Sequence, residues 1–384
     1  MKKKMIKWLA ICFVFLAWTD CAQGETMASG DDFVQEQLIG QMDFEGIQQM
    51  LDQALGKGEF SFADAVKKIL SGNQEVSKEV LQGFLQGLFF NLVKGEKDTL
   101  LRILLLILGT AFLTNLSAVF EDGQAVEITF YMLYLLLFIM IMNSFAQLSC
   151  NLSGSLGWIC DFMKVLTPAY FMTVAASTGA ATAAVFYQGI LMLTWMIQWI
   201  LTAFLLPGVN LYILLCLVNH LTKESMLSKL ADLLESLIRW GMKSLLGIVT
   251  GLQIVKGMVA PVMDSLKRTA LGKTASAIPG IGNAVNTVTE LVVTTGVLVR
   301  NCVGVAALLA LLVTAAAPVL HYGFLSLAYR FLAALAQPVA DKRIVGALTT
   351  MGEGCGLLLR ILLTAEVLCM LMFIILTLSF GGGG

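Results

Sequence analysis

Long apolar runs with almost no charge dominate this sequence and limit the folds that it can adopt. Residues 128–149 (ITFYMLYLLLFIMIMNSFAQLS) contain no charged side chain, and residues 101–120 and 189–219 have a similar character. A helix that rises 1.5 Å per residue needs about 20 such residues to cross a bilayer core about 30 Å thick. Charged residues make up 13% of the 384 residues, about half the fraction found in soluble domains. The sequence therefore predicts an all-α fold, a polytopic transmembrane helix bundle of about seven spans.

The expected transmembrane helical domain, residues 99–380, divides at turn and charge signals. Residues 189–219 contain Pro207 and are long enough for a tilted, Pro-kinked helix or for two half-helices. The topology stays open, because a signal peptide would place the acidic turn 121–127 in the cytoplasm, where the positive-inside rule prefers Lys and Arg. The expected helical segments are 101–120, 128–149, 167–186, 189–219, 241–263, 276–301, 302–338 and 355–380, with a charged amphipathic connector at 220–240.

The N-terminus has the three parts of a secretory signal. Four lysines within the first seven residues precede an apolar core at 8–18, and small residues occupy 22–24 (AQG). Residues 1–24 are therefore expected to be a cleaved signal peptide, the alternative being an uncleaved first helix. Residues 25–98 predict an extracytoplasmic region of amphipathic helices, either docked on a partner or forming a cap on the membrane domain. The four glycines at 381–384 predict a flexible tail.

One segment of the expected membrane domain is built from small residues. In residues 167–186 (TPAYFMTVAASTGAATAAVF), 13 of the 20 are Ala, Ser, Thr or Gly, and residues 280–298 are likewise small and polar. Small residues allow close helix packing in lipid, and polar groups at membrane depth must be buried in protein or line water. Two interpretations stay open: a pair of pore-lining or gate-forming elements, or tight structural packing. The helix-break or gate candidates are Pro168, Gly179, Pro207, Pro279, Gly280, Gly282 and Pro318.

Proline spacing raises the question of an internal repeat. Pairs of prolines 39 residues apart recur with an offset of 111 residues: Pro168 with Pro207, and Pro279 with Pro318. Repeat units at 165–263 and 276–374 would follow, and three spans per unit would invert the second copy, as in many transporters. A chance coincidence among the six prolines explains the spacing equally well.

Five ionisable residues fall in or beside apolar segments, where a charge is costly and usually has a partner or a path to water. Opposite signs allow two pairs, Lys256 with Glu366 and Glu290 with Arg300, while Arg300 and Arg330 can instead extend along helix ends to reach water. These intramembrane candidates are Lys256, Glu290, Arg300, Arg330 and Glu366.

Nothing in the sequence predicts an enzyme. There is no HExxH or GxSxG motif and no paired Asp motif in a span, and the two histidines are far apart, so no catalytic residue and no metal site is expected. No cofactor is expected either, and without a GxxxxGK[ST] loop any ATP hydrolysis would belong to a partner. The net charge of −1 and the lack of a basic cluster give no indication of nucleic-acid binding.

Four motifs, taken in their order, connect the chain to a known family. They are QMDFEGIQQMLDQAL (41–55), AASTGAATAAVFYQG (175–189), IPGIGNAVNTVTELVVTTGVLVRNCVGVAAL (278–308) and ALAQPVADKRIVGALTTMG (334–352). In combination they resemble the stage III sporulation protein AE family of endospore-forming bacteria, and the resemblance covers nearly the whole chain. The C-terminal GGGG is not part of it.

The resemblance implies a role in endospore formation. Members of that family are multi-pass proteins of the mother-cell membrane around the forespore. With the other products of the stage III sporulation A operon and the forespore protein Q, they are expected to form a channel complex that includes a secretion-type ATPase. The chain would supply the membrane conduit or export gate, needed for forespore development and late forespore gene expression. The alternative is an autonomous secondary transporter for a small solute, which the repeat and the buried charges would suit.

Overall fold

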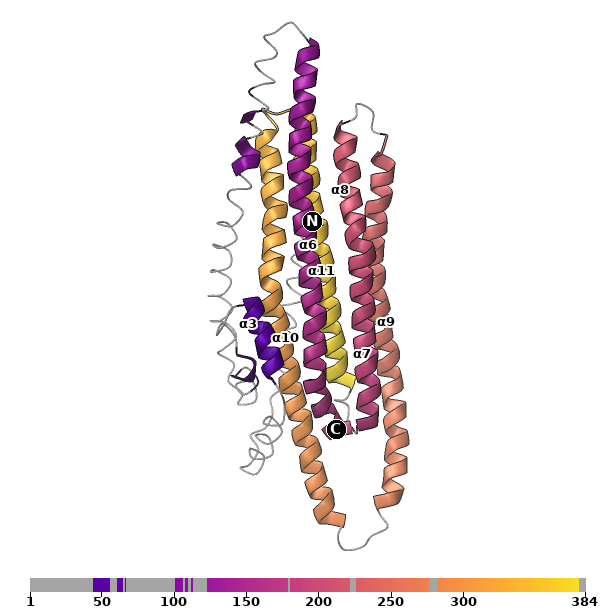
Figure 1. Ribbon diagram of the computed structural model, residues 1–384. Helices are drawn as coiled ribbons and strands as arrows, with labels where there is room; N and C mark the ends of the chain where they lie inside the picture. The colour runs from indigo at the N-terminus through magenta and orange to yellow at the C-terminus, as the bar shows by residue number, and fades with distance from the viewer. Residues whose placement is uncertain are drawn as a thin grey trace.

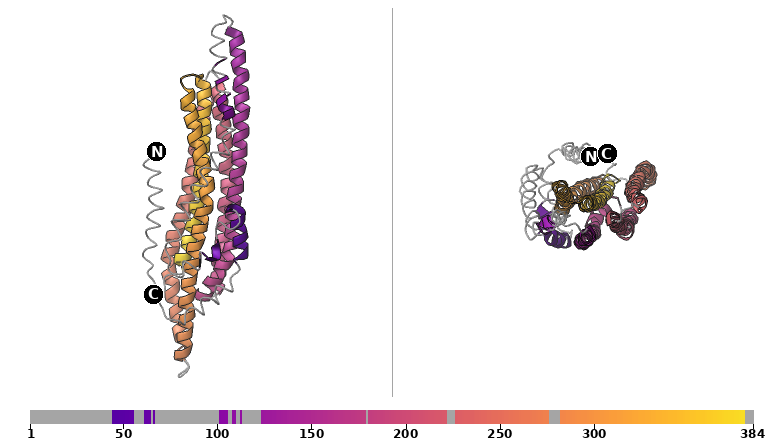
Figure 2. Two further views of the ribbon diagram at one scale, coloured as in Figure 1. Left: turned by 90° about the vertical axis from the view of Figure 1, so that its left-hand side faces the viewer. Right: turned by 90° about the horizontal axis from the view of Figure 1, so that it is seen from above.

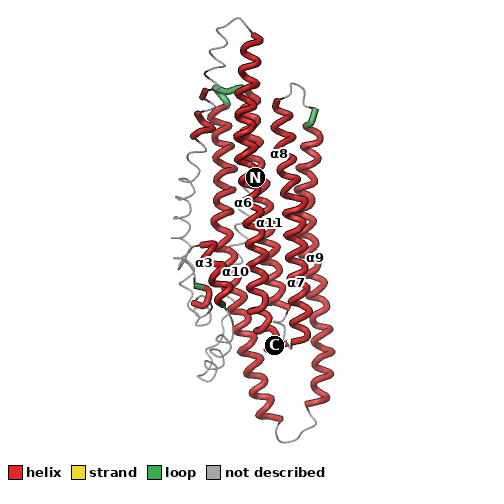
Figure 3. Tube along the Cα trace, in the orientation of Figure 1, coloured by secondary structure: helices red, strands yellow, loops and turns green. Residues whose placement is uncertain are grey.

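The computed structural model describes residues 44–55, 61–64, 66, 101–105, 108–109, 112, 123–178, 180–221, 226–275 and 282–379. Within these ranges all regular structure is helical, as Figure 3 shows, which confirms the predicted all-α class. The predicted signal peptide, the tail and most of region 25–98 lie outside the described residues. The helices are α3 (Glu45–Leu55), α6 (Gly123–Thr178), α7 (Ala180–Ile200), the π-helix η2 (Leu201–Leu205), α8 (Leu206–Leu221), α9 (Ser228–Ala275), α10 (Gly282–Ala336) and α11 (Lys342–Ser379).

The long helices lie side by side along one common axis (Figures 1 and 2). In the view of Figure 1, α6 runs down the molecule and α7 with α8 returns to the top. Helix α9 then descends, α10 ascends and α11 descends again. Helices α9 and α10 continue below the lower end of α11 and form a two-helix arm, which is visible at the bottom of Figures 1 and 2.

Four stretches of the described residues are long and apolar enough to cross a bilayer. The predicted count of about seven spans is therefore not confirmed. Helix α9 is not among the four, because the part of it with described side chains carries charges on nearly every turn. The four candidate spans are Phe130–Pro168, Gln188–Leu221, Cys302–Ala336 and Lys342–Phe373.

The small-residue segment 167–186 differs from the separate span that the sequence predicts. Helix α6 ends at Thr178 and α7 begins at Ala180, and the two pack antiparallel. The Tyr134 hydroxyl donates a hydrogen bond of 2.8 Å to the carbonyl of Leu217, near the open end of this hairpin. Residues 167–178 and 180–186 thus lie at the closed end of the hairpin.

The two predicted repeat units differ in the structure. Residues 276–301 and 302–338, expected as separate segments, belong largely to the single helix α10. In the other unit the matching small-residue segment is divided between α6 and α7. The repeat stays a prediction, with this difference between its halves.

Pro207 has a visible effect on the run that the sequence predicts as either one kinked helix or two half-helices. Proline has no N–H to donate, and its ring crowds the preceding turn. The chain responds with the π-turn η2, in which the N–H of Leu206 bonds to the carbonyl of Leu201. Helices α7 and α8 therefore continue through η2 as one distorted helix, which agrees with the first alternative.

Helix α11 is the centre of the bundle. Its span is 61% buried, against 33% for that of α6, and it packs against α6, α8, α9 and α10. On the outside, α3 lies against α6 and α10 (Figure 1), with Ile47 and Leu51 buried. Helix α3 falls within the predicted amphipathic region, and the extracytoplasmic location of that region stays a prediction.

Candidate functional site in the membrane bundle

Helix α11 carries polar side chains along the stripe that it does not bury. Glu353 comes four residues after Thr349, and Arg360 comes seven residues after Glu353. These spacings place the three side chains on one face of the helix. Thr349 and Glu353 are exposed, and Arg360 is half-buried. The span Lys342–Phe373 has 32 residues, so any stretch of about 20 within it, the length that a bilayer requires, includes Arg360. A membrane-spanning stretch of α11 would therefore include a charged side chain.

The first part of α9 has three distinct faces. Ala231, Ile238 and Met242 are buried against the bundle. The face beside them is charged, and there Arg239 pairs with Glu235 one turn away. The remaining face is apolar and exposed, as expected of lipid contact, and consists of Leu230, Leu233, Leu237 and Trp240.

The charged faces of α9 and α11 meet next to α10. Among the described residues, Arg360 lies within electrostatic range of Glu235 and Arg239 from α9, Arg330 from α10 and Glu353 from α11 itself. We call these five residues the charged cluster. Helix α8 joins it through Tyr212, whose hydroxyl donates a hydrogen bond of 3.3 Å to the Glu353 carboxylate. The cluster carries three positive and two negative side chains, and it is assembled from separate helices.

Two glycines of α11 hold Arg330 in place. A Cβ atom added to Gly352 would lie 2.8 Å from Arg330 Cγ and 3.2 Å from the carbonyl oxygen of Ser326, so α10 and α11 touch here through backbone. The Ser326 hydroxyl donates a hydrogen bond of 2.8 Å to the carbonyl of Gly352. A Cβ on Gly356 would lie 3.9 Å from the Arg330 guanidinium. The arginine stem thus crosses the glycine surface and brings its charge to the cluster.

Gly354, between these two, faces the opposite way. A Cβ there would overlap Ile213 of α8 and lie 2.8 Å from the Phe145 ring of α6. Three alternating glycines therefore let α11 approach three helices at one level. The sequence reasoning missed this motif, GEGCG (352–356), although small residues in an apolar helix are a recognised signal of close packing.

Glu366 lies apart from the charged cluster. It is 4% exposed and its Oε2 atom has no hydrogen-bond partner among the described residues. It is six residues beyond Arg360, which turns it about 120° around α11 at 3.6 residues per turn. Arg360 therefore faces away from this carboxyl.

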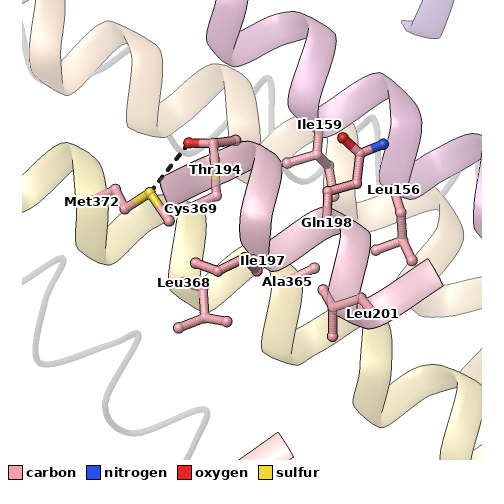
Figure 4. Close-up of a pocket in the computed structure, with 10 residues that line it drawn as sticks. All are labelled: Leu156, Ile159, Thr194, Ile197, Gln198, Leu201, Ala365, Leu368, Cys369 and Met372. Atoms are coloured by element: carbon pink, nitrogen blue, oxygen red, sulfur yellow. Dashed lines mark hydrogen bonds between the residues drawn. The ribbon is translucent and has the colours of Figure 1, made fainter. Parts of the chain in front are cut away.

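A small cavity lies between α6, α7 and α11 (Figure 4). Side chains that line it include Ile159, Gln198, Ala365 and Cys369, and the Thr194 hydroxyl donates a hydrogen bond of 3.3 Å to the sulfur of Met372 at its edge. Its volume of about 20 Å³ has room for roughly one water molecule. This cavity is too small for an organic substrate.

Comparison with known proteins identifies the family. Residues 60–380 match the family described as Stage III sporulation protein AE (spore_III_AE). The chain belongs to the stage III sporulation protein AE family. A protein of Bacillus subtilis (strain 168) named "Stage III sporulation protein AE" is 24% identical over 320 residues, which cover 83% of this chain and 79% of the relative. No solved structure matches the chain. The family predicted from the sequence motifs is confirmed, and the charged cluster lies inside the matched residues.

The structure of this stage III sporulation protein AE family member separates the predicted ionisable residues. It brings Arg330 into the charged cluster and leaves Glu366 on another face of α11. Glu290 and Arg300 lie ten residues apart in α10, and their side chains lie outside the described residues, so their pairing stays a prediction. The side chain of Lys256 lies outside the described residues, so its pairing with Glu366 stays a prediction.

The structure describes four of the seven predicted gate residues, and they lie on different helices, α6, α8 and α10. Pro168 is exposed near the end of α6, Pro207 follows the π-turn, and Pro318 is accommodated inside the continuous helix α10. Gly282 is the first residue of α10, and Gly179, Pro279 and Gly280 lie outside the described residues. The described residues also hold no group of three His, Cys, Asp or Glu side chains that could bind a metal ion.

Proposed function

We propose that this protein is an integral membrane subunit of a complex that connects the mother cell and the forespore during sporulation. It would contribute one wall of the membrane conduit or export gate. Family membership supports the sporulation role, and the charged cluster on the outside of the helix bundle is the observation that carries the proposal.

A charged surface inside a bilayer requires water or protein, instead of lipid, next to it. A charged side chain at the centre of a membrane-spanning helix costs about 2.5–3.5 kcal/mol even by the mildest scale. Arg360 is half-buried and Glu353 is exposed, so water or another protein must replace lipid there. A water-lined path between this face and a neighbouring subunit meets that requirement for both residues.

The location of the polar groups distinguishes this function from that of an autonomous transporter. A secondary transporter binds its solute between its own helices near the bilayer midplane. Where its side chains are described, the interior of this bundle is apolar apart from a few serine and threonine side chains and Glu366, and its small cavity holds about one water molecule. The charged cluster lies at the edge of the bundle, which favours a path completed by partners over one enclosed by a single chain.

The partners would be the other membrane proteins of the stage III sporulation A operon and, through them, the forespore protein Q. ATP hydrolysis would come from one of these partners. In this arrangement the protein supports forespore development and late forespore gene expression as part of an assembly, in the mother-cell membrane that surrounds the forespore.

Photo-crosslinking in sporulating cells tests the proposal. A photoreactive amino acid is placed at Thr349 or Arg360 on the polar face of α11 and, as a control, at Met132 of α6, which is 70% exposed on an apolar surface. We expect the two α11 positions to crosslink to operon-encoded membrane proteins and Met132 to crosslink to lipid. Lipid adducts alone from all three positions would contradict the proposal.

Reconstitution separates the two functions directly. Liposomes that contain only this protein should swell in small solutes no faster than protein-free liposomes do. Rapid swelling without any partner would favour the transporter, because it would show a complete path within one chain.

A further inference from the structure

Glu366 is the most deeply buried acidic side chain of the described bundle, and the charged cluster does not involve it. It lies in α11 within the candidate span Lys342–Phe373 and is 4% exposed. We propose that Glu366 is a proton-binding site, which holds its carboxyl group in the neutral, protonated form while α6, α10 and α11 are packed together. This inference is independent of the proposed function, since it concerns another face of the helix.

The packing around Glu366 follows from the register of the helices. Helices α10 and α11 are antiparallel, with Gly352 against Ser326 and Gly323 against Leu359. Continuing this register places Glu366 level with residues 312–316 of α10. On the other side, α6 and α11 run in the same direction with Phe145 against Gly354, which places Gly157 level with Glu366.

None of the described cations near Glu366 is placed to neutralise its carboxylate. Arg360 faces away on α11, and Arg330 packs at Gly352, fourteen residues and about 21 Å along the helix from Glu366. The charged groups of α6 nearest this level, Asp161 and Lys164, are exposed and pair with each other at 2.7 Å. Among the described residues, Glu366 thus has no counter-ion.

Among the described residues, two thiols lie near Glu366. Cys369 is three residues further along α11 and within electrostatic range of the carboxyl group, and Cys160 of α6 is within electrostatic range of Cys369. Both thiols are buried, and neutral thiols give a carboxylate no charge compensation. Helix α10 contributes Thr314 at this level, but that hydroxyl already bonds to the carbonyl of Ala310 at 2.8 Å.

A neutral carboxylic acid satisfies these surroundings and an ionised one does not. Burying an unpaired carboxylate in an apolar interior is so unfavourable that such a group takes up a proton instead. The proton needs water to enter or leave, so its exchange requires α10 or α6 to move away from α11. Proton binding and the closed packing are then linked: the closed packing holds the proton more tightly, and raising the pH favours the opened state.

Infrared spectroscopy of the full-length protein tests the site. The protein is reconstituted in vesicles of phosphatidylethanolamine and phosphatidylglycerol at neutral pH. We expect a carbonyl stretching band of a protonated carboxyl group that is lost in Glu366→Gln, an uncharged substitution of the same size. Glu353→Gln serves as the matched control, because Glu353 lies on the same helix but is exposed, and it should leave the band in place.

Chemical labelling of the unmodified protein gives a second, variant-free measurement. A hydrophobic carbodiimide reacts with protonated carboxyl groups in apolar surroundings, and peptide mass spectrometry locates the adduct. We expect it on Glu366 and not on Glu353. An ionised Glu366, with no adduct and no infrared band attributable to it at neutral pH, would overturn the proposal and point instead to a buried cation or to water beside it.

Discussion

The Tyr212 hydroxyl of α8 and the Glu353 carboxylate of α11 are joined by a hydrogen bond of 3.3 Å across the edge of the charged cluster. The two residues are 141 positions apart in the chain, so the bond links the hairpin of α6, α7 and α8 to the central helix. A hydrogen bond to a charged group at the boundary of an apolar bundle fixes the direction in which that charge points.

A double-mutant cycle should measure this link. Tyr212→Phe and Glu353→Gln each remove or weaken the same bond, so their combined effect on the free energy of unfolding should be less than the sum of the single effects. The expected coupling is about 0.5–1.5 kcal/mol. Thermal unfolding of the purified variants in detergent provides the measurement, and strictly additive effects would show that the bond is absent in solution.

Gly352 should be intolerant of even the smallest side chain. Gly352→Ala places a Cβ 2.8 Å from Arg330 Cγ and 3.2 Å from the Ser326 carbonyl, and overpacking of this kind costs about 1–3 kcal/mol. Gly154→Ala in α6 is the matched control, because nothing lies within 4 Å of the added atom, and its better helix propensity should stabilise by up to about 1 kcal/mol. Equal melting temperatures for the two variants would mean that α10 and α11 do not touch at Gly352.

The contact between His220 and Gly346 predicts a rescue. A Cβ on Gly346 would lie 2.7 Å from the imidazole of His220, which would displace the ring from its 3.1 Å hydrogen bond with Thr350. Gly346→Ala should therefore destabilise by about 1–3 kcal/mol. Adding His220→Ala creates the missing room, so the double variant should be more stable than the two single losses together imply. A double variant that shows the full sum would place the imidazole elsewhere.

Loss of Arg360 should weaken the assembly more than it weakens the protein itself. Removing one member of a covered charge pair at an interface costs about 2–5 kcal/mol of binding, so Arg360→Leu should reduce copurification of partner membrane proteins by at least about tenfold. Heat-resistant spores should fall in parallel, while the amount of the protein in the membrane stays unchanged. Lys229→Leu, an exposed charge near the start of α9, is the control. The proposed function would be contradicted if both variants kept their partners.

The sequence predicts the class of this fold and part of its candidate site. Apolar runs identify the membrane helices because their length reflects the thickness of the bilayer, and an isolated charge such as Arg330 or Glu366 stands out within them. The hairpin at 167–186 could not be predicted in the same way, since small residues suit both a turn and a packed span. The continuity of α10 also escaped, because apolar periodicity does not mark where one helix ends within a long apolar stretch.

The charged cluster could not be predicted because it depends on how distant helices pack. Glu235 and Arg239 look like an ordinary exposed pair on an amphipathic helix, and Arg360 looks like a single charge in the last apolar run. Only the approach of α9 and α10 to α11 brings them together. The close contact at Gly352 that fixes this approach involves backbone atoms of α10. The reason for this glycine is evident only in the structure, where Ser326 and Arg330 lie opposite Gly352.

The unbroken length of α10 has a mechanical consequence. Its 55 residues extend about 83 Å, and its lower part continues into the arm beside α9 (Figure 1). Pro318 lies between the arm and Arg330, and an interior proline removes one helix hydrogen bond and allows a bend at that point. A push on the tip of the arm would therefore divide between bending at Pro318 and a tilt of Arg330 against Gly352 and Gly356 of α11.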